Sequence, residues 1–294
     1  MRLASYTGAD GASYGIVTDR GIVDLGRRLG ARCPDLRALL AAGALDEARR
    51  FAAEAPDRAL AETALAPVIP NPDKIVCVGL NYEEHRIEAN REKTEHPALF
   101  LRVPGSQVGH GQPILLPLES DKLDYEGEIA VVIGLAGRRI PKARAWEHVA
   151  GYSCYNDGSI RDWQRHTVQW TAGKNFERTG GFGPWMTTAD EIPAGAVLTL
   201  TTRLNGAVMQ QATTEMMIFP IPRLIAYVST FVTLLPGDVI VTGTPGGVGF
   251  KRNPPVYMKP GDRVEVEVSR IGTLTNTIAA EAARPERAGR ATED

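Results

Sequence analysis

The residues best suited to chemistry are three carboxylates, two of which lie close together in the chain. Glu126 and Glu128 flank Gly127 directly before an apolar run, Ile129–Ile133. In an extended chain alternate side chains point to the same face, so the two carboxylates would lie about 6.5–7 Å apart. Asp157 ends a run of uncharged residues and offers a third carboxylate at the end of a predicted strand. Oxygen ligands without Cys or His favour Mg²⁺, Mn²⁺ or Ca²⁺ over zinc.

A histidine and a lysine add acid–base and electrostatic chemistry. His85 and Glu88 lie three residues apart in NYEEHRIE, so a short helix would place them on one face. A carboxylate beside an imidazole fixes its tautomer and raises its basicity, which suits a general base that activates water. Lys174 lies among glycine and aromatic residues, a setting that suits a cation stabilising an oxyanion.

A glycine-rich loop, VTGTPGGVG at 241–249, follows another predicted strand. Backbone N–H groups in such a loop can approach a carboxylate or phosphate ligand. The loop does not match the Walker pattern, because Phe250 separates Gly249 from Lys251, and no G-x-G-x-x-G opens a helix. The sequence therefore does not support an ATP or NAD site.

Each of these residues also has an ordinary structural interpretation. The Glu-x-Glu pair could lie on a solvated strand edge, and Asp157 could cap a helix or form an Asx turn. His85 and Glu88 could belong to an exposed charged turn, and Lys174 could be a surface lysine with a packed stem. From residue types alone these alternatives stay open.

Composition limits the classes of protein to be considered. The 294 residues contain 33 Lys+Arg and 35 Asp+Glu, and 43% are hydrophobic, so the chain can bury a full core and carries no basic field for nucleic acid. Aromatic residues are only 6%, whereas there are 30 Gly and 20 Pro, which favours short strands joined by tight turns. We expect a β-rich enzyme or binding protein that does not bind nucleic acid.

The cysteines and the N-terminal sequence bear on location. The three cysteines lie far apart without a C-x-x-C pair, so neither a zinc ribbon nor a disulfide framework is indicated. The first residues have no apolar segment typical of a signal peptide, and no uninterrupted apolar run approaches about 18 residues. We expect a cytoplasmic protein without membrane attachment.

The chain divides unevenly near residue 70. Residues 2–25 predict short strands, and helical sequence follows from Asp35 to about Ala64. Three prolines at 66–74 block helix and central strand, which predicts a linker. We therefore predict a small accessory domain at 1–70, a main domain at 71–280 and a flexible tail at 281–294.

The main domain is predicted to consist mostly of strands. These are rich in Val, Ile and Thr and bounded by Gly, Pro or Asp. The predicted strands lie within 74–82, 126–134, 148–157, 196–206, 237–243 and 262–272, with helical segments at 82–93 and 222–234.

The order of the motifs along the chain adds a resemblance. GLNYxxH is followed by DYEGE, YND, GKNF and TGTPGGVG. This order over residues 74–278 resembles the fumarylacetoacetate hydrolase family. The resemblance implies an α+β, β-rich mixed β-sandwich roll with a small N-terminal α/β accessory domain, usually assembled as a homodimer.

The resemblance also assigns roles to residues. It implies one divalent ion per chain, Mg²⁺ or Mn²⁺, held by Glu126, Glu128 and Asp157. It further implies a catalytic dyad, a catalytic lysine and substrate contacts in the glycine-rich loop. The dyad is His85 with Glu88, the lysine is Lys174, and the substrate contacts are Gly243 and Thr244.

The chemistry implied by the family starts from a 2-oxo acid bound through its pyruvoyl end. The stretch RDWQRHTVQWTAGKNF is most similar to bacterial enzymes of aromatic-acid breakdown, which favours an acylpyruvate hydrolase of the maleylpyruvate or fumarylpyruvate type. Oxaloacetate or oxo-diacid decarboxylation and isomerisation or hydration of 2-hydroxydienoates are alternatives within the family. A protein that only binds an oxo acid would be expected to lack one ligand or the base.

The far end of a dicarboxylic substrate needs a cation or hydrogen-bond donors. Arg161 and Gln164, three residues apart on a possible helix after Asp157, are candidates, and Gln210 is another. Their alternative is an ordinary polar role at the protein surface.

Overall fold

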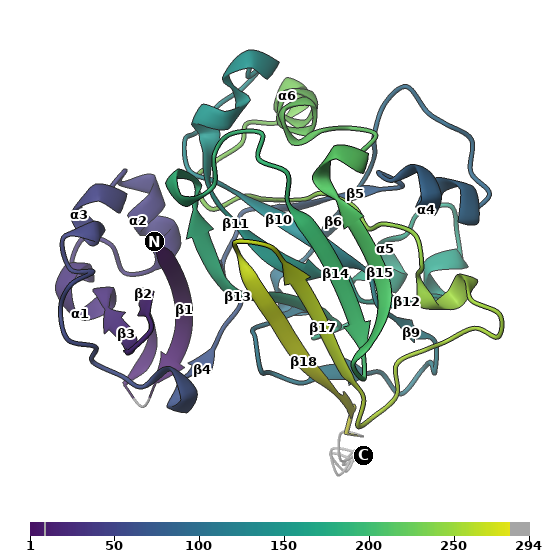
Figure 1. Cartoon of the computed structure of the whole chain (residues 1–294), viewed down its shortest axis with the longest axis horizontal. Helices are drawn as coiled ribbons and strands as arrows, with labels where there is room; N and C mark the ends of the chain where they lie inside the picture. Colours follow the sequence, from purple (N-terminus) through teal and green to yellow (C-terminus); the bar gives the residue numbers. More distant parts are fainter. Residues whose placement is uncertain (9, 283–294) are drawn as a thin grey trace, which may run out of the picture.

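A computed structural model describes residues 1–8 and 10–282 of the chain (Figure 1). All but the first two residues of the predicted tail, 281–294, lie outside the described residues. No helix in the described part is long and apolar enough to cross a membrane.

The N-terminal region contains short strands followed by short helices. Its elements are β1 (Arg2–Gly8), β2 (Gly11–Thr18), β3 (Gly21–Asp24), α1 (Leu25–Leu29), α2 (Leu36–Ala41), α3 (Leu45–Arg49) and β4 (Ala64–Leu65). The strands predicted before residue 25 are confirmed. The predicted helical stretch from Asp35 to about Ala64 is too long, since the α-helices end at Arg49. Asp35 caps α2 through Ala38 N, but Gly43 adopts φ +61° and separates α2 from α3.

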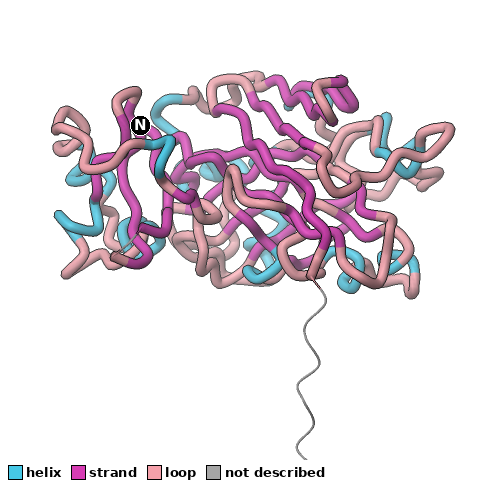
Figure 2. Tube along the Cα trace, turned by 90° about the horizontal axis from the view of Figure 1, so that it is seen from below, coloured by secondary structure: helices cyan, strands magenta, loops and turns pink. Residues whose placement is uncertain are grey.

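The rest of the described chain, up to residue 282, is dominated by strands, with three α-helices. Its elements are β5 (Ile75–Gly79), α4 (Glu83–Glu88), β6 (Ala98–Arg102), β7 (Gln107–Val108), β8 (Ile114–Leu116), β9 (Leu123–Asp124), β10 (Gly127–Ile133), β11 (Val149–Asn156), β12 (Ser159–Ile160), α5 (Thr171–Lys174), β13 (Gly180–Thr188), β14 (Thr199–Leu204), β15 (Ala207–Thr213), α6 (Ile221–Phe231), β16 (Val239–Val241), β17 (Arg263–Val268) and β18 (Gly272–Ala280). Every strand predicted in the main domain is present. Figure 2 shows the short helices scattered around a body of strands and loops.

Two large sheets organise the molecule. The first has the order β3-β2-β1-β13-β11-β10-β16-β5-β6, with β4 added beside β1 and β7 beside β13. The second has the order β15-β14-β17-β18-β8, and a small pair joins β12 to β9. Most pairs are antiparallel, whereas β16 with β5, β13 with β7, and β18 with β8 are parallel. The predicted β-rich α+β class is confirmed.

The alternation of side chains in β10 assigns each face of the first sheet. Ile129, Val131 and Ile133 lie in a core shared with residues of the second sheet and of α6. Ala130 and Val132 lie in a core shared with residues of α1 and α2. One face of β10 therefore packs on the second sheet, and the other faces the N-terminal helices.

The first sheet continues across the boundary predicted near residue 70. Arg2 and Leu3 of β1 pair with Thr187 and Met186 of β13. The proline-rich stretch 66–74 has no helix or strand, as expected, but Val68 and Ile69 within it are buried. The N-terminal region is thus joined to the main body by backbone pairing and packing as well as by the chain. In Figure 1 it lies on the left, and α4, α5, β9 and β12 lie on the right.

Candidate metal centre and active site

Three buried carboxylates converge at the beginning of β10. Glu126, Glu128 and Asp157 each offer an oxygen, and these atoms lie within 4.8 Å of one another. Both glutamates face away from the second sheet, since a Cβ on Gly127 between them would meet Thr202 Oγ1 of that sheet at 1.9 Å. The predicted same-face arrangement is therefore what the structure shows. The alternative of a solvated strand edge does not apply, because all three residues are buried.

Asp157 is held in place by a fully buried arginine. Asp157 caps no helix, because β12 begins two residues later, and Asp162 caps the next short turn instead. Arg102 Nη1 donates to Asp157 Oδ1 at 2.5 Å. The other Arg102 donors reach Gly158 O, Ser106 and Thr179 Oγ1, so all three guanidinium nitrogens are bound. This fork fixes one oxygen of Asp157 and leaves Oδ2 facing the other carboxylates.

Lys174 joins two of the carboxylates. Its Nζ lies 2.7 Å from Glu126 Oε2 and 2.7 Å from Asp157 Oδ2. α5 ends at Lys174, and the residue is only 1% exposed, so the surface-lysine alternative does not apply. Of the three ammonium hydrogens two serve the carboxylates, and one is left for another acceptor.

The two glutamates differ in their proton affinity. Burial raises the pKa of Glu128 well above its usual range, and neighbouring Asp157 and Glu126 raise it further. Burial also opposes ionisation of Glu126, but Lys174 and Arg161 outweigh it and lower the pKa of Glu126 to about 2. Glu128 therefore keeps its proton over a pH range in which Glu126 is ionised.

This donor set fits a divalent ion. The group that the described residues form consists of three carboxylates without Cys or His, which suits hard cations such as Mg²⁺ or Mn²⁺. Once Glu128 is ionised, four buried carboxylates outnumber the three buried cations around them, which also favours added positive charge. The carboxylates are Asp124, Glu126, Glu128 and Asp157, and the cations are Arg102, Arg161 and Lys174.

Ion binding is expected to release a proton from Glu128. At mildly acidic pH, below its raised pKa, the carboxyl must ionise to act as a ligand, so about one proton should leave per ion bound. Affinity should then rise with pH. Calorimetric titration of Mn²⁺ in buffers of different ionisation enthalpy measures this release. Glu128→Gln should abolish the release, and a parent protein that binds Mn²⁺ without releasing a proton would contradict the assignment.

The predicted dyad is formed, and its histidine lines the same cavity as Glu126 and Glu128. His85 Nδ1 lies 2.8 Å from Glu88 Oε1, and Gly247 N donates to Glu88 Oε2 at 3.0 Å. Burial opposes ionisation of Glu88, but these hydrogen bonds and His85 lower its pKa. With Nδ1 directed to Glu88, the free nitrogen of the imidazole is Nε2. His85 is 7% exposed, so it does not belong to a solvated turn.

The glycine-rich loop contributes backbone and side-chain contacts. Gly243 N donates to Glu128 Oε2 at 2.5 Å, and Thr244 Oγ1 donates to Gly127 O at 3.0 Å. Thr244 lines the cavity. Gln210 does not line it: its amide nitrogen donates to Thr244 Oγ1 and Pro245 O, and its oxygen accepts from Gly127 N. Gln210 therefore holds the loop against β10.

Arg161 and Gln164 both line the cavity, although no full helix carries them. Arg161 contacts Glu126 Oε1 at 2.6 Å and Asp124 Oδ2 at 2.8 Å. Its Nη1 also donates to Gln164 Oε1 at 3.0 Å. Arg161 Nη2 is buried without a partner in the described part of the chain. The arginine thus lies at the carboxylate end of the cavity with one donor free.

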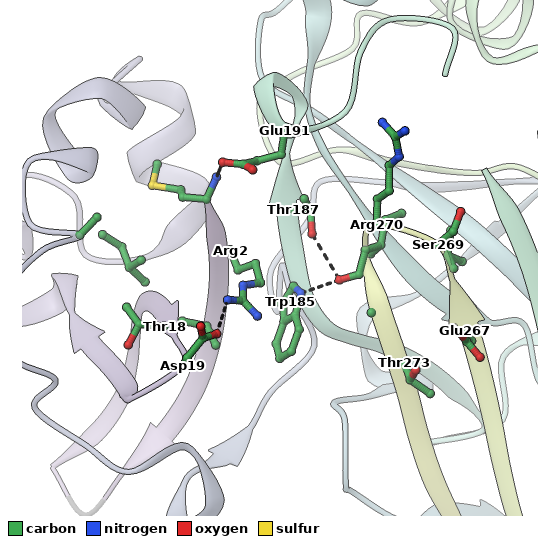
Figure 3. Close-up of a pocket in the computed structure, with 17 residues that line it drawn as sticks. Arg2, Thr18, Asp19, Trp185, Thr187, Glu191, Glu267, Ser269, Arg270 and Thr273 are labelled. Atoms are coloured by element: carbon green, nitrogen blue, oxygen red, sulfur yellow. Dashed lines mark hydrogen bonds and ion pairs between the residues drawn. The ribbon is translucent and has the colours of Figure 1, made fainter. Parts of the chain in front are cut away.

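The cavity has a volume of about 730 Å³ and brings most of the predicted residues together. Its lining includes His85, Glu126, Glu128, Arg161 and Lys174. A second, more open groove of about 960 Å³ lies between the N-terminal region and the main body (Figure 3). Labelled residues there include Arg2, Asp19, Trp185 and Arg270, and none of the predicted site residues lines it.

Two residues important to the site were not predicted. Arg102 is a lone cation in an apolar strand, ALFLR, which was the available signal. Asp124 was part of the DYEGE motif but received no role. It accepts from Arg161, Gly249 N and Phe250 N, so it connects the glycine-rich loop to the arginine.

Comparison with known proteins identifies relatives along most of the chain. A curated mitochondrial oxaloacetate tautomerase of Bos taurus is 44% identical over 218 residues, 74% of this chain and 69% of the relative. A crystal structure described as a putative HpcE protein from Mycobacterium smegmatis is 36% identical, with a TM-score of 0.86, covering 96% of this chain and 100% of the other. Maleylpyruvate hydrolase from Sphingobium sp. SYK-6, solved with manganese(II) and pyruvate, is 29% identical with a TM-score of 0.80 and the same coverages.

The match to a family model is consistent with both the fold and the site. The model describes the C-terminal domain of fumarylacetoacetate (FAA) hydrolase, and it matches residues 74–279, which include every candidate site residue. Members of this family are enzymes. The chain belongs to the fumarylacetoacetate hydrolase family.

Proposed function

We propose that this protein is a divalent-metal enzyme that interconverts the enol and keto forms of oxaloacetate or a closely related 2-oxo diacid. The observation that carries the proposal is that His85, paired with Glu88, lines the same cavity as Glu126 and Glu128, two of the three grouped carboxylates. The choice of oxaloacetate is supported by the 44% identity to oxaloacetate tautomerases. Acylpyruvate hydrolysis, favoured by the sequence motifs, becomes the second candidate.

Bound Mg²⁺ or Mn²⁺, held by Glu126, Glu128 and Asp157, would supply the positive charge that stabilises an enolate. Lys174 adds a donor, since one ammonium hydrogen remains for the oxygen on which negative charge develops. His85 Nε2 moves the proton at C3 of the substrate, and Glu88 stabilises the imidazolium that forms. In ketonisation C3 gains a proton and the enol oxygen on C2 loses one to solvent, so the reaction needs these two proton transfers and no water that acts as a nucleophile.

The same groups can serve hydrolysis if the substrate carries an acyl group on C3. His85 would then take a proton from water attacking the acyl carbonyl, and the carbon–carbon bond would break to give pyruvate and a carboxylic acid. The observation favouring this second candidate is the similarity to the maleylpyruvate hydrolase with manganese and pyruvate. The two candidates differ in their products and can be separated directly.

A substrate panel distinguishes them. Enol oxaloacetate, maleylpyruvate, fumarylpyruvate and a 2-hydroxydienoate are each followed by loss of enol absorbance with Mg²⁺ or Mn²⁺, and products are identified by chromatography. We expect accelerated ketonisation of oxaloacetate with the carbon skeleton unchanged. Faster release of pyruvate and maleate from maleylpyruvate would favour hydrolysis, and CO₂ release from oxaloacetate would favour decarboxylation.

We further propose that Arg161 binds the second carboxylate of this substrate. Arg161 lines the cavity, its Nη1 contacts Glu126, and its buried Nη2 has no partner among the described residues. Arg161→Lys keeps a charge for Asp124 and Glu126 but removes the guanidinium fork. We expect KM for oxaloacetate to rise about tenfold, about 1.4 kcal/mol. The dissociation constant of pyruvate should change little, and an equal loss for both ligands would place Arg161 at the pyruvoyl end.

The assembly and location of the protein remain predictions from the resemblance and the sequence. We propose a homodimer that binds neither nucleic acid nor membranes. Light scattering during size-exclusion chromatography measures the molecular mass, and a monomeric mass would contradict the proposed dimer.

A further inference from the structure

We infer that Tyr125 and Arg252 position the catalytic dyad by fixing the backbone of Gly247. These three residues are called the Gly247 clamp below. Neither side chain lines the cavity, so both act from outside it. The inference rests on the proposed function, because it assumes that His85 moves the substrate proton.

Few side chains hold α4, the helix that carries the dyad, against the rest of the protein. His85 is the one buried residue of this helix, and Ile87 is 62% exposed. Backbone contacts fix the N-terminal end, where Ile218 N donates to Asn81 O at 2.8 Å. The position of the C-terminal end, where Glu88 lies, therefore depends on other contacts.

Glu88 forms the contact that fixes this end. Gly247 N donates to Glu88 Oε2 at 3.0 Å, while Glu88 Oε1 lies 2.8 Å from His85 Nδ1. Among residues 1–8 and 10–282, the glycine-rich loop is the only segment outside 82–91 that forms a hydrogen bond with a side chain of α4. The orientation of the His85 ring is thus set, through Glu88, by the backbone of this loop.

The carbonyl group of Gly247 is held as well as its N–H. It accepts from the Tyr125 hydroxyl at 3.1 Å and from Arg252 Nε at 3.3 Å. Arg252 Nε also donates to the Tyr125 hydroxyl at 3.1 Å, so the two side chains hold each other. Since both backbone groups belong to one residue, fixing the carbonyl limits the movement of the N–H that binds Glu88.

The second sheet supports the clamp directly. Gly247 has a φ of +97°, and a Cβ on it would lie 2.3 Å from Met209 O, so glycine is required at this position. Arg252 Nη2 donates to the same carbonyl at 2.6 Å. Because Met209 belongs to β15, the loop and the arginine are both held against that strand.

Tyr125 connects the clamp to the metal-binding carboxylates. It lies between Asp124 and Glu126 in the chain and is completely buried. The segment that places Glu126 at the candidate metal site therefore also places the hydroxyl that holds the loop. The base and the carboxylates share one support, which fixes the distance between them.

This support matters for proton transfer, because His85 Nε2 must lie within hydrogen-bond reach of the proton that it moves. A displacement of about 1 Å can cost about 10²-fold in rate. The three carboxylates that would bind the metal do not include Glu88. A weakened clamp should therefore lower kcat and leave KM almost unchanged.

Two substitutions weaken the clamp to different degrees. Tyr125→Phe removes one oxygen atom, whereas Arg252→Met removes the donors to two backbone carbonyls and keeps an apolar stem. For the Mn²⁺-loaded full chain, we expect kcat for oxaloacetate ketonisation to fall about tenfold in Tyr125→Phe and about a hundredfold in Arg252→Met. KM and the affinities for Mn²⁺ and oxalate should stay almost unchanged.

The matched controls lose the same kinds of contact elsewhere. Tyr14→Phe removes a buried hydroxyl that donates to Cys33 O at 2.8 Å. Arg138→Met removes a guanidinium that donates to Thr230 O at 3.2 Å. Both controls should keep the parent kcat.

A double-mutant cycle separates positioning of the dyad from a general structural role. If the clamp acts through the imidazole, Arg252→Met should cause no further loss of kcat in a protein that already carries His85→Gln. An equal loss in both backgrounds would overturn the inference, because the arginine would then act on something other than the base.

Hydrogen exchange tests the clamp without turnover. We expect the amide hydrogens of 86–91 to exchange about tenfold faster in both clamp variants than in the parent, and at the parent rate in both controls. Unchanged exchange in the clamp variants would overturn the inference and leave the proposed function standing. A parent that does not accelerate ketonisation, with faster exchange still seen in the variants, would instead overturn the proposed function and leave the clamp as a structural anchor of α4.

Discussion

Replacing His85 with glutamine should lower kcat by about 10²–10⁴, the usual loss when a general base is removed. The Nδ1 atom of the His85 imidazole lies 2.8 Å from Glu88 Oε1. This contact orients the ring and leaves Nε2 as the basic nitrogen for the substrate. Because the proposed metal ligands are the three grouped carboxylates and do not include His85, the affinity for Mn²⁺ should stay almost unchanged. The measurement is steady-state ketonisation of oxaloacetate together with a Mn²⁺ titration.

The matched control is His96→Gln. His96 is an exposed histidine that stacks on Tyr227 and does not line the cavity. It should retain the parent kcat. Near-normal turnover of His85→Gln would eliminate the dyad as the catalytic base, and loss of Mn²⁺ binding in that variant would instead indicate a structural role.

In the metal-free protein, replacing Glu126 should lower the stability of the fold much more than replacing Glu128. Glu126 is ionised against Lys174 and Arg161, so Glu126→Gln removes a buried partner and should destabilise the fold by about 3 kcal/mol. This is the low end of the usual range, because each cation keeps another carboxylate. Glu128 has a raised pKa, so glutamine resembles its protonated form, and Glu128→Gln should change stability by less than about 1 kcal/mol.

In the presence of metal, Glu128→Gln should also become less stable than the parent. A saturating ion at about 100 times its dissociation constant stabilises the parent by about 2.7 kcal/mol through mass action. Glu128→Gln removes a ligand and should lose most of that gain. Urea unfolding with chelator and with Mn²⁺ measures both effects. Equal stabilisation of parent and Glu128→Gln by Mn²⁺ would contradict a site at these carboxylates.

The same pKa shifts predict the pH dependence of metal-free stability. Folding raises the pKa of Glu128, so its contribution is fully present below the ordinary glutamate pKa of about 4.3 and is lost as pH rises through the raised value. Folding lowers the pKa of Glu126 to about 2, so its contribution is present above about 4.3 and is lost as pH falls toward that value.

Local sequence patterns predicted those parts of the site whose geometry is fixed by residues close together in the chain. Alternation along one strand is enough to place Glu126 and Glu128 on the same face, and an i, i+3 spacing is enough to join His85 to Glu88. The position of Asp157 could not be predicted from a local pattern. It approaches the glutamates because β10 and β11 pair in the register Gly127 with Asn156. The resemblance supplied that information, whereas residue types alone did not.

Contacts between residues far apart in the chain explain the features that were not predicted from the sequence. β13 is central in the first sheet, but its sequence GGFGPWMTT has the glycine and proline content of a loop. Gly181 lies there because a Cβ would meet Asn276 Oδ1 at 2.6 Å, a contact between segments far apart in the chain. Arg102 likewise acquires its role only when folding brings Asp157 and Thr179 to it. Neither contact leaves a periodic signal.

The most direct test of metal-dependent enolisation at this site is the rate of oxaloacetate ketonisation followed by loss of enol absorbance. It is measured for the chelator-treated protein, the same protein reconstituted with Mn²⁺, and reconstituted Glu128→Gln. We expect acceleration above the solution rate only in the reconstituted parent, with the carbon skeleton intact. Equal acceleration by the chelated and reconstituted parent, or by Glu128→Gln, would contradict the account.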